Sequence, residues 1–271
     1  MSQPSKTLTT GQRLAKKYEG KSLLEILDDL KAHYAISSQQ VLSYCLASWY
    51  EKEATPEFKE YIEGLRKFSK DLKVEIDTAR EENKKTDKQE ANWLTWSQIV
   101  TLRDLWKTQE AKSHRNHQCY LALCAYTFLP PQRLNWCNVF IVPEGETPPE
   151  TGNYMTSTEV TFRDYKTAKN YGTLTLPLPK VFQEVVAASL EKYPRRYLFG
   201  HRNHNTPFTP AALSHLLMEA FAPTGRQAAA NLIRHSYASF IHADKPSVAE
   251  ETAEAKKMGH SATQSRLYAK K

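Results

Sequence analysis

Apolar residues in the first third of the chain recur at the three- and four-residue spacing of amphipathic helices. Residues 23–30 and residues 41–49 each carry such a stripe. A third stripe follows Thr55-Pro56, and a capping residue followed by proline at the first helical position is a typical helix start. We therefore expect three short helices that pack together in a helical N-terminal domain.

Residues 79–90 interrupt this pattern, because they read AREENKKTDKQE and contain almost no apolar side chain. A segment so dense in charge cannot bury a hydrophobic face, and it suits a fraying helix end followed by a linker. The sequence thus predicts a helical domain over residues 1–90, with the charged linker at about 79–90, and a second domain over residues 91–271.

The second domain opens with a clear helix start. Thr95 and Gln98 have the spacing of a capping box, in which each side chain bonds the backbone of the other residue. An apolar helix over residues 118–128 then stops at Pro130-Pro131, because proline cannot continue a helix.

Farther along, the period changes from helical to alternating. Val160 and Phe162 alternate with polar residues, as do Leu174, Leu176 and Leu178 after a polar turn, and this is the pattern of a β-hairpin. Helical spacing returns in four later segments, namely residues 179–192, 209–221, 227–242 and 247–258. The predicted fold class is mainly α with a small antiparallel β-sheet.

Composition narrows the class of protein. The 271 residues are 40% hydrophobic and 25% charged, as in globular proteins that bury a core. Because the chain has no apolar run of about eighteen residues and no secretory signal at its polar start, we expect an intracellular protein. The net charge of +7 favours a polyanionic partner but does not by itself identify one. We expect reduced core thiols, and no disulfide framework, at Cys45, Cys119, Cys124 and Cys137.

One helical segment carries two polar groups on a single face. Asn231 and Arg234 are three residues apart, so both leave the apolar helix together. An exposed helical face would explain an isolated pair, but other polar residues accompany this one. His260 follows a predicted helix end in the text Met-Gly-His-Ser, and Tyr268 comes one or two helical turns later. These residues can therefore face one cavity.

Arg133, in the text Pro-Pro-Gln-Arg, and Lys166, at the turn of the hairpin, complete an ordered set. The set resembles that of the tyrosine recombinases, also called phage-integrase-like proteins: an arginine, a hairpin lysine, a His-x-x-Arg pair, a histidine or tryptophan, and a tyrosine. The resemblance covers roughly residues 92–268, and the Pro-Pro-x-Arg and Met-Gly-His-Ser texts look closest to integrases of viral or mobile-element origin. The matching residues are Arg133, Lys166, Asn231, Arg234, His260 and Tyr268.

The resemblance implies site-specific cleavage and rejoining of double-stranded DNA through a covalent 3′-phosphotyrosine. It implies that Tyr268 is the nucleophile and that Arg133 and Arg234 neutralise the phosphorane-like transition state with bidentate hydrogen bonds. Lys166 would protonate the departing 5′ oxygen, and His260 would be the hydrogen-bonding neighbour of the phenol. The resemblance also implies a DNA-binding N-terminal domain and a homo-tetramer on two DNA duplexes.

No cofactor is expected, because a phosphotyrosine linkage retains the energy of the broken bond. The sequence agrees, since it has no Gly-x-x-x-x-Gly-Lys loop for a nucleotide and no cluster of paired carboxylates for Mg²⁺. We therefore expect activity in the presence of a chelator.

Three features depart from the family pattern. Asn231 stands where the family has histidine, and an amide can bond a phosphate oxygen but cannot carry a proton, so proton transfer would rest more on His260. Trp136 stands where the family often has an acidic residue. The sequence ends at Lys271, so we expect subunit contacts to lie mostly upstream of Tyr268.

Three other interpretations stay open. The text Ser-Arg-Leu-Tyr at residues 265–268 faintly resembles that of type IB topoisomerases, which nick and reseal one strand. Asn231 motivates a DNA-binding relative that has lost catalysis. A zinc site is a third interpretation, although the cysteine spacing does not match a structural zinc pattern. Its ligands would come from His114, His117, Cys119 and Cys124, or separately from His201 and His204.

Overall fold

The structure, a computed structural model, describes residues 9–53, 55–201 and 206–270. The chain divides into two compact units, Met1–Glu82 and Asn83–Lys271. None of the helices in the described ranges combines the length and the apolar character that crossing a bilayer requires.

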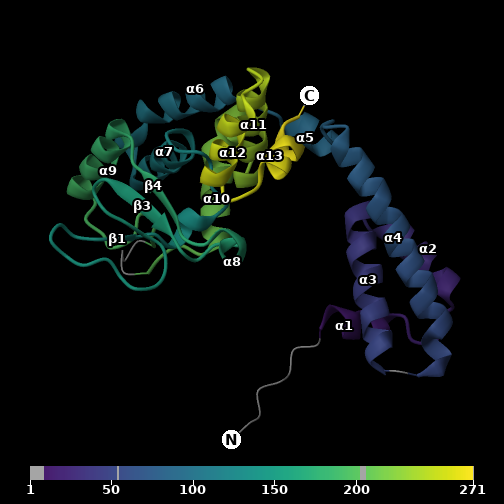
Figure 1. Ribbon diagram of the computed structural model, residues 1–271. Coiled ribbons are helices and arrows are strands. Elements are labelled where there is room, and N and C mark those ends of the chain that lie inside the picture. Colours follow the sequence, from purple (N-terminus) through teal and green to yellow (C-terminus); the bar gives the residue numbers. More distant parts are fainter. Residues whose placement is uncertain (1–8, 54, 202–205, 271) are drawn as a thin grey trace, which may run out of the picture. The chain divides into compact units, whose positions relative to one another are not determined.

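The first unit is helical, and α3 and α4 lie side by side along their lengths (Figure 1). Its elements are α1 (Thr10–Lys17), α2 (Leu23–His33), α3 (Ile36–Glu53), the 3₁₀ turn η1 (Pro56–Phe58) and α4 (Lys59–Glu81). Ile26, Leu30, Leu46 and Leu65 are at most 1% exposed and form the centre of its core. The three predicted helices are therefore confirmed. Helix α1 was not predicted, because only two of its eight residues are buried, Gly11 and Leu14.

The first half of the second unit contains the small sheet together with several helices (Figure 1). Its elements are α5 (Asp87–Asn92), α6 (Trp96–Lys107), η2 (Glu110–Lys112), α7 (His114–Thr127), η3 (Asn135–Asn138), β1 (Phe140–Ile141), β2 (Tyr154–Met155), β3 (Glu159–Phe162), α8 (Ala168–Tyr171) and β4 (Leu174–Pro177). Helix α7 is the central helix of this unit, because ten consecutive residues from His117 to Tyr126 are buried.

The second half of this unit is helical. Its elements are α9 (Lys180–Lys192), α10 (Pro210–Phe221), η4 (Ala222–Thr224), α11 (Ala230–Ala243), α12 (Val248–Lys257) and α13 (Ala262–Tyr268). The capping box of Thr95 and Gln98 at the start of α6 forms as predicted. The chain thus has the mainly helical fold that its sequence predicts.

The sheet has the order β1-β2-β3-β4. Strands β3 and β4 form the predicted antiparallel hairpin, with Val160 opposite Leu176. The small predicted sheet is mixed, because β1 and β2 pair in parallel, with Phe140 opposite Tyr154, whereas the other neighbouring strands pair antiparallel. Strands β1 and β2 have two residues each, which is too few to show an alternating pattern.

The charged segment over residues 79–90 is more helical than its composition suggests. Helix α4 continues to Glu81, and α5 begins after a capping box formed by Thr86 and Gln89. A capping box satisfies backbone donors locally, so a short helix can start without an apolar face.

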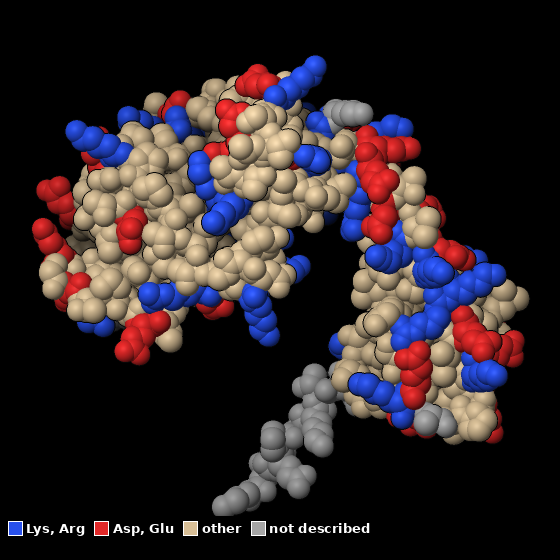
Figure 2. Space-filling view, in the orientation of Figure 1, with Lys and Arg blue, Asp and Glu red and all other residues tan. Residues whose placement is uncertain are grey.

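Net charge is distributed unevenly between the units. Residues 1–82 contain 13 Lys and Arg and 14 Asp and Glu, whereas residues 83–271 contain 24 and 16. Figure 2 shows Lys and Arg side chains projecting from the second unit in the region where α8 lies. The excess of positive charge therefore belongs to the second unit.

The cysteines behave as the sequence predicts. All four are free thiols, and Cys119, Cys124 and Cys137 are buried, whereas Cys45 is half-buried. Burial raises the pKa of Cys119 and of Cys124 to about 12, so both remain protonated at neutral pH.

Candidate functional site

Helices α11 and α13 and the turn after α12 carry four of the six candidate residues. Asn231 and Arg234 lie on α11, and Tyr268 is the last residue of α13, which packs against α11 and α12. His260 follows Gly259, whose φ of 67° is in the left-handed region that glycine favours. The amide of His260 donates to Ala255 O (3.1 Å), and that of Gly259 donates to Lys256 O (3.0 Å). This pair of bonds is a Schellman motif, which fixes the position of His260 at the end of α12.

Arg234 is fully buried, and most of its hydrogen bonds go to backbone carbonyls. The guanidinium donates to Pro131 O (2.6 Å) and to Met258 O (3.2 Å). No ion pair joins it to a carboxylate of the described residues, and its Nε has no hydrogen-bond partner. Burial lowers the pKa of Arg234, and the positive charge of Arg133 lowers it further. The site thus holds a desolvated guanidinium with no carboxylate partner among the described residues.

His260 lies beside Arg234 and is 3% exposed. Its Nδ1 is 3.3 Å from Arg234 Nη2. Because a guanidinium only donates hydrogen bonds, Nδ1 accepts, and the proton of the neutral imidazole is on Nε2. That Nε2 is buried and has no partner among the described residues. Burial, followed by the nearby charge of Arg234, lowers the pKa of His260 to about 3, so the ring is neutral at physiological pH.

Tyr268 is in contact with these groups through both its ring and its hydroxyl. The ring centre is 5.2 Å from Arg234 Cζ and 5.3 Å from the ring centre of His260. The hydroxyl donates to Asn231 Oδ1 at 3.3 Å. The sequence predicts His260 as the hydrogen-bonding neighbour of the phenol, but in the structure Asn231 has that place.

A fifth residue, His235, contacts Tyr268 and was missed by the sequence analysis. Its ring stacks on that of Tyr268, with ring centres 4.4 Å apart and planes 25° apart. The only sequence signal for it is its place directly after Arg234 in the text Arg-His-Ser-Tyr-Ala, which the resemblance carried as context without a role.

Arg133 is half-buried, and the segment that carries it is hydrogen-bonded to α7 and to the end of α12. Its carbonyl accepts a hydrogen bond from the hydroxyl of Tyr126. The adjacent Gln132 donates to Lys257 O at 2.8 Å, near the end of α12. The charge of Arg133 contributes to the lowered pKa of both Arg234 and His260. The charge of the second arginine therefore acts on the same two groups.

Lys166 is exposed on the turn between β3 and β4. The next residue, Thr167, donates to Gly259 O at 2.8 Å, one residue before His260. No hydrogen bond or ion pair within the described ranges joins the side chain of Lys166 to the other five candidates. The hairpin turn is thus attached to the cluster, while its lysine points to solvent.

Trp136 is fully buried and packs edge-on against Phe162 of β3, with ring centres 5.1 Å apart. It therefore ties the segment that carries Arg133 to the sheet through apolar contact.

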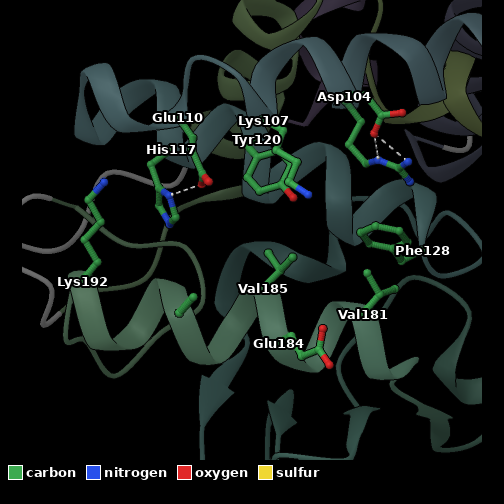
Figure 3. A pocket seen from close by; sticks show the side chains of 12 residues that line it. Asp104, Lys107, Glu110, His117, Tyr120, Phe128, Val181, Glu184, Val185 and Lys192 are labelled. Atoms are coloured by element: carbon green, nitrogen blue, oxygen red, sulfur yellow. Dashed lines mark hydrogen bonds and ion pairs between the residues drawn. The ribbon is translucent and has the colours of Figure 1, made fainter.

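Figure 3 shows a separate cavity of about 500 Å³, lined by residues of α6, α7 and α9. None of the six candidates lines it. Its histidine, His117, has both ring nitrogens engaged, at 3.0 Å from Glu110 Oε2 and at 2.7 Å from Ser189 Oγ. Ser189 is fully buried, its Oγ also accepts from Arg195 Nη2 at 2.7 Å, and it does not line the cavity, so its hydroxyl is not open to a substrate there.

The described residues contain no group of three or more His, Cys, Asp and Glu that would hold a metal ion. The ligand set with His114, His117, Cys119 and Cys124 is thus not assembled. His204, a ligand of the other zinc interpretation, lies outside the described residues.

No family model matches the chain, and no curated protein matches it. Solved structures do resemble it over nearly its full length. One is the crystal structure of XerA recombinase, with a TM-score of 0.47 and 11% identity over 98% of this chain and 87% of that chain. Another is the Tn1549 transposon integrase in complex with a circular intermediate DNA, with a TM-score of 0.49 and 11% identity over 98% and 96%.

A third is the same integrase in complex with transposon right end DNA, with a TM-score of 0.47 and 12% identity over 96% of this chain and 94% of that chain. The chain is thus structurally similar to a recombinase and an integrase at low sequence identity. Similarity at this level concerns the course of the chain, so the roles of residues rest on the contacts described above.

Proposed function

We propose that the chain is a DNA strand transferase of the tyrosine-recombinase type, with Tyr268 as its nucleophile. One observation carries this proposal: of the four buried side-chain polar atoms that have no partner among the described residues, Arg234 Nε and His260 Nε2 belong to side chains that contact Tyr268. Leaving a buried donor unpaired costs about 1–3 kcal/mol, so such donors are expected where a ligand supplies the acceptor. A phosphodiester beside Tyr268 would supply anionic acceptor oxygens to both.

The reaction exchanges one phosphate ester for another. The oxygen of Tyr268 attacks the phosphorus, the bond to the 5′ oxygen breaks, and the products are a 3′-phosphotyrosine and a free 5′ hydroxyl. Attack by a 5′ hydroxyl on the phosphotyrosine reverses the step and joins the strands. Arg133 and Arg234 would neutralise the charge that develops on the non-bridging oxygens, and Lys166 would protonate the leaving oxygen once DNA brings it close.

The contacts of His260 itself suit it to donate a hydrogen bond rather than to act as a base. Its Nδ1 is engaged by Arg234, and its protonated Nε2 suits a non-bridging phosphate oxygen. Asn231 accepts from the phenol but cannot take its proton, since an amide is not basic. We therefore propose that the phenol proton leaves to the phosphate or to water, while Arg234 stabilises the negative charge that forms.

The proposed substrate is double-stranded DNA, and the proposed assembly is a homo-tetramer on two duplexes inside the cell. The excess of Lys and Arg in residues 83–271 supports a polyanionic partner for the second unit. A DNA-binding role for the first unit rests only on the resemblance, because residues 1–82 carry no such excess.

The test uses a pool of nicked DNA duplexes of randomised sequence. Cleavage near the nick releases a short fragment, and because its 5′ hydroxyl is lost the strand cannot be rejoined and the adduct is trapped. The wild-type chain should form a covalent protein–DNA adduct that survives denaturation and that a chelator does not prevent. Tyr268→Phe and Arg234→Ala should form none, whereas Tyr171→Phe, which alters an exposed tyrosine of α8, should react like wild type. An adduct with Tyr268→Phe would move the nucleophile elsewhere.

The same experiment separates the alternatives. Absence of adduct from every variant, with DNA binding retained, would favour the DNA-binding relative that has lost catalysis. Relaxation of a supercoiled plasmid without joining of two duplexes would favour a type IB topoisomerase. Against that enzyme, Arg266 of the Ser-Arg-Leu-Tyr text is bonded to Glu251 by two hydrogen bonds of 2.8 Å and is therefore occupied outside the site.

A further inference from the structure

One face of α11 holds the segment that carries Tyr268. Asn231, His235 and Ser239 are spaced four residues apart, so they lie above one another on the same face of the helix. Each contacts a different part of the segment. Asn231 Oδ1 accepts from the hydroxyl of Tyr268 (3.3 Å), His235 Nδ1 is 2.7 Å from Tyr268 O, and Ser239 Oγ accepts from the amide of Lys270 (2.7 Å).

His235 is the central residue of this face and contacts both the backbone and the ring of Tyr268. Because a carbonyl only accepts, Nδ1 carries the proton and donates it to Tyr268 O. Burial lowers the pKa of His235 to about 4, so its imidazole is neutral at physiological pH. The same ring stacks on the phenol ring. A single side chain thereby restrains where the backbone of Tyr268 lies and how its side chain is oriented.

We infer that His235 is a positioning residue for the nucleophile. It orients the phenol by stacking and by its hydrogen bond to the carbonyl, and it does not itself exchange a proton with the phenol. This inference rests on the proposed function only in taking Tyr268 as the nucleophile, since the contact itself is independent of DNA. Displacement of a reacting group by about 1 Å can lower a rate about 100-fold, so losing both restraints should slow the chemical step strongly.

Three substitutions of His235 separate its two contacts. His235→Asn keeps a side-chain amide donor near the position of Nδ1 but removes the stacked ring. His235→Phe keeps an aromatic ring but removes the donor. His235→Ala removes both. The matched control is His215→Ala, because His215 is an exposed histidine on α10 with no contact to α13 among those described.

The first measurement needs no DNA. With 3-fluorotyrosine placed at position 268, the ¹⁹F resonance should be displaced from that of the free amino acid and insensitive to solvent in the wild-type background. His235→Ala should move it towards the free value, and His235→Asn and His235→Phe should each restore part of the displacement. An unchanged resonance in a folded His235→Ala chain would overturn the inference. If that chain does not fold, the asparagine and phenylalanine variants decide, and identity of both with wild type would overturn it.

The second measurement is the single-turnover rate of adduct formation beside the dissociation constant for the same nicked DNA. His235→Ala should slow adduct formation about 10- to 100-fold with DNA affinity unchanged, and His235→Asn should recover part of the rate. Equal rates for the alanine variant and wild type would contradict the inference. If wild type forms no adduct at all, the proposed function fails, while the ¹⁹F resonances still report whether His235 positions Tyr268.

Discussion

The two units of the chain treat buried polar groups differently. In the first unit, the buried hydroxyls of Ser43 and Ser69 each donate to a backbone carbonyl, at 2.8 Å and 3.1 Å. In the second unit, four buried side-chain atoms have no partner among the described residues, namely Trp136 Nε1, Arg234 Nε, Ser236 Oγ and His260 Nε2. An apolar core with satisfied polar groups is sufficient to explain the first unit. The second unit retains a destabilising arrangement, which is expected where function requires it.

The largest effect is expected at the buried guanidinium. Arg234→Lys keeps the positive charge but removes the planar fork of donors, so the rate of adduct formation should fall about 100- to 1000-fold. Single-turnover kinetics on the nicked duplexes measure this. Arg103→Lys is the control, because Arg103 lies on α6 and pairs with Asp104, and its rate should match wild type. A rate for Arg234→Lys close to wild type would contradict the proposal that the guanidinium of Arg234 stabilises the transition state.

Core truncation tests whether the units are stabilised separately. Leu46→Ala, at a fully buried position of the first unit, should lower its free energy of unfolding by about 2–5 kcal/mol. Hydrogen exchange should then show faster exchange in α1 to α4 with α11 unchanged. Leu216→Ala, fully buried on α10, should show the reverse. Equal loss of protection in both units after either substitution would mean that they unfold as one.

Acid should destabilise the second unit selectively. The pKa values of His235 and His260 in the folded chain are about 4 and about 3, below the value of about 6.5 for an unfolded histidine. The folded state thus binds fewer protons, so the free energy of unfolding is highest above about pH 6.5 and falls as the pH decreases towards these lower values. The slope is about 1.4 kcal/mol per pH unit for each histidine.

The first unit provides the comparison, because its one histidine, His33, is exposed. Urea unfolding is followed at pH 7 and at pH 5 by brief proteolysis, and the cleavage fragments show which unit has unfolded. Lowering the pH from 7 to 5 should reduce the stability of the second unit alone. His260→Asn should reduce the pH dependence. A similar acid sensitivity in both units would contradict the assignment to buried histidines.

The smallest effect is expected where the two units are alike. Ser22 is the N-cap of α2 and Thr95 is the N-cap of α6, each with a complete capping box. Ser22→Ala and Thr95→Ala should each lower the free energy of unfolding of their own unit by about 1 kcal/mol. Thermal unfolding measures both. A much larger loss at Thr95 would mean that the start of α6 has a role beyond helix capping.

The sequence by itself determined the elements whose signals are local. The capping box of Thr95 and Gln98, the hairpin around Val160 and Leu176, and the helix that pairs Asn231 with Arg234 depend on residues close along the chain or on a simple alternation. The residues that stabilise such an element lie close together in the sequence, so the sequence pattern alone predicts the element.

Only the tertiary structure decided which groups meet. The parallel pairing of β1 with β2, the bond from Tyr268 to Asn231 and the stacking of His235 on Tyr268 join segments that no local pattern relates. Tyr268 and Asn231 are 37 residues apart, and their contact depends on how α13 packs against α11. The sequence supplied the polar residues of the site, while helix packing decided that Asn231 bonds the phenol, that His260 contacts Arg234, and that His235 stacks on Tyr268.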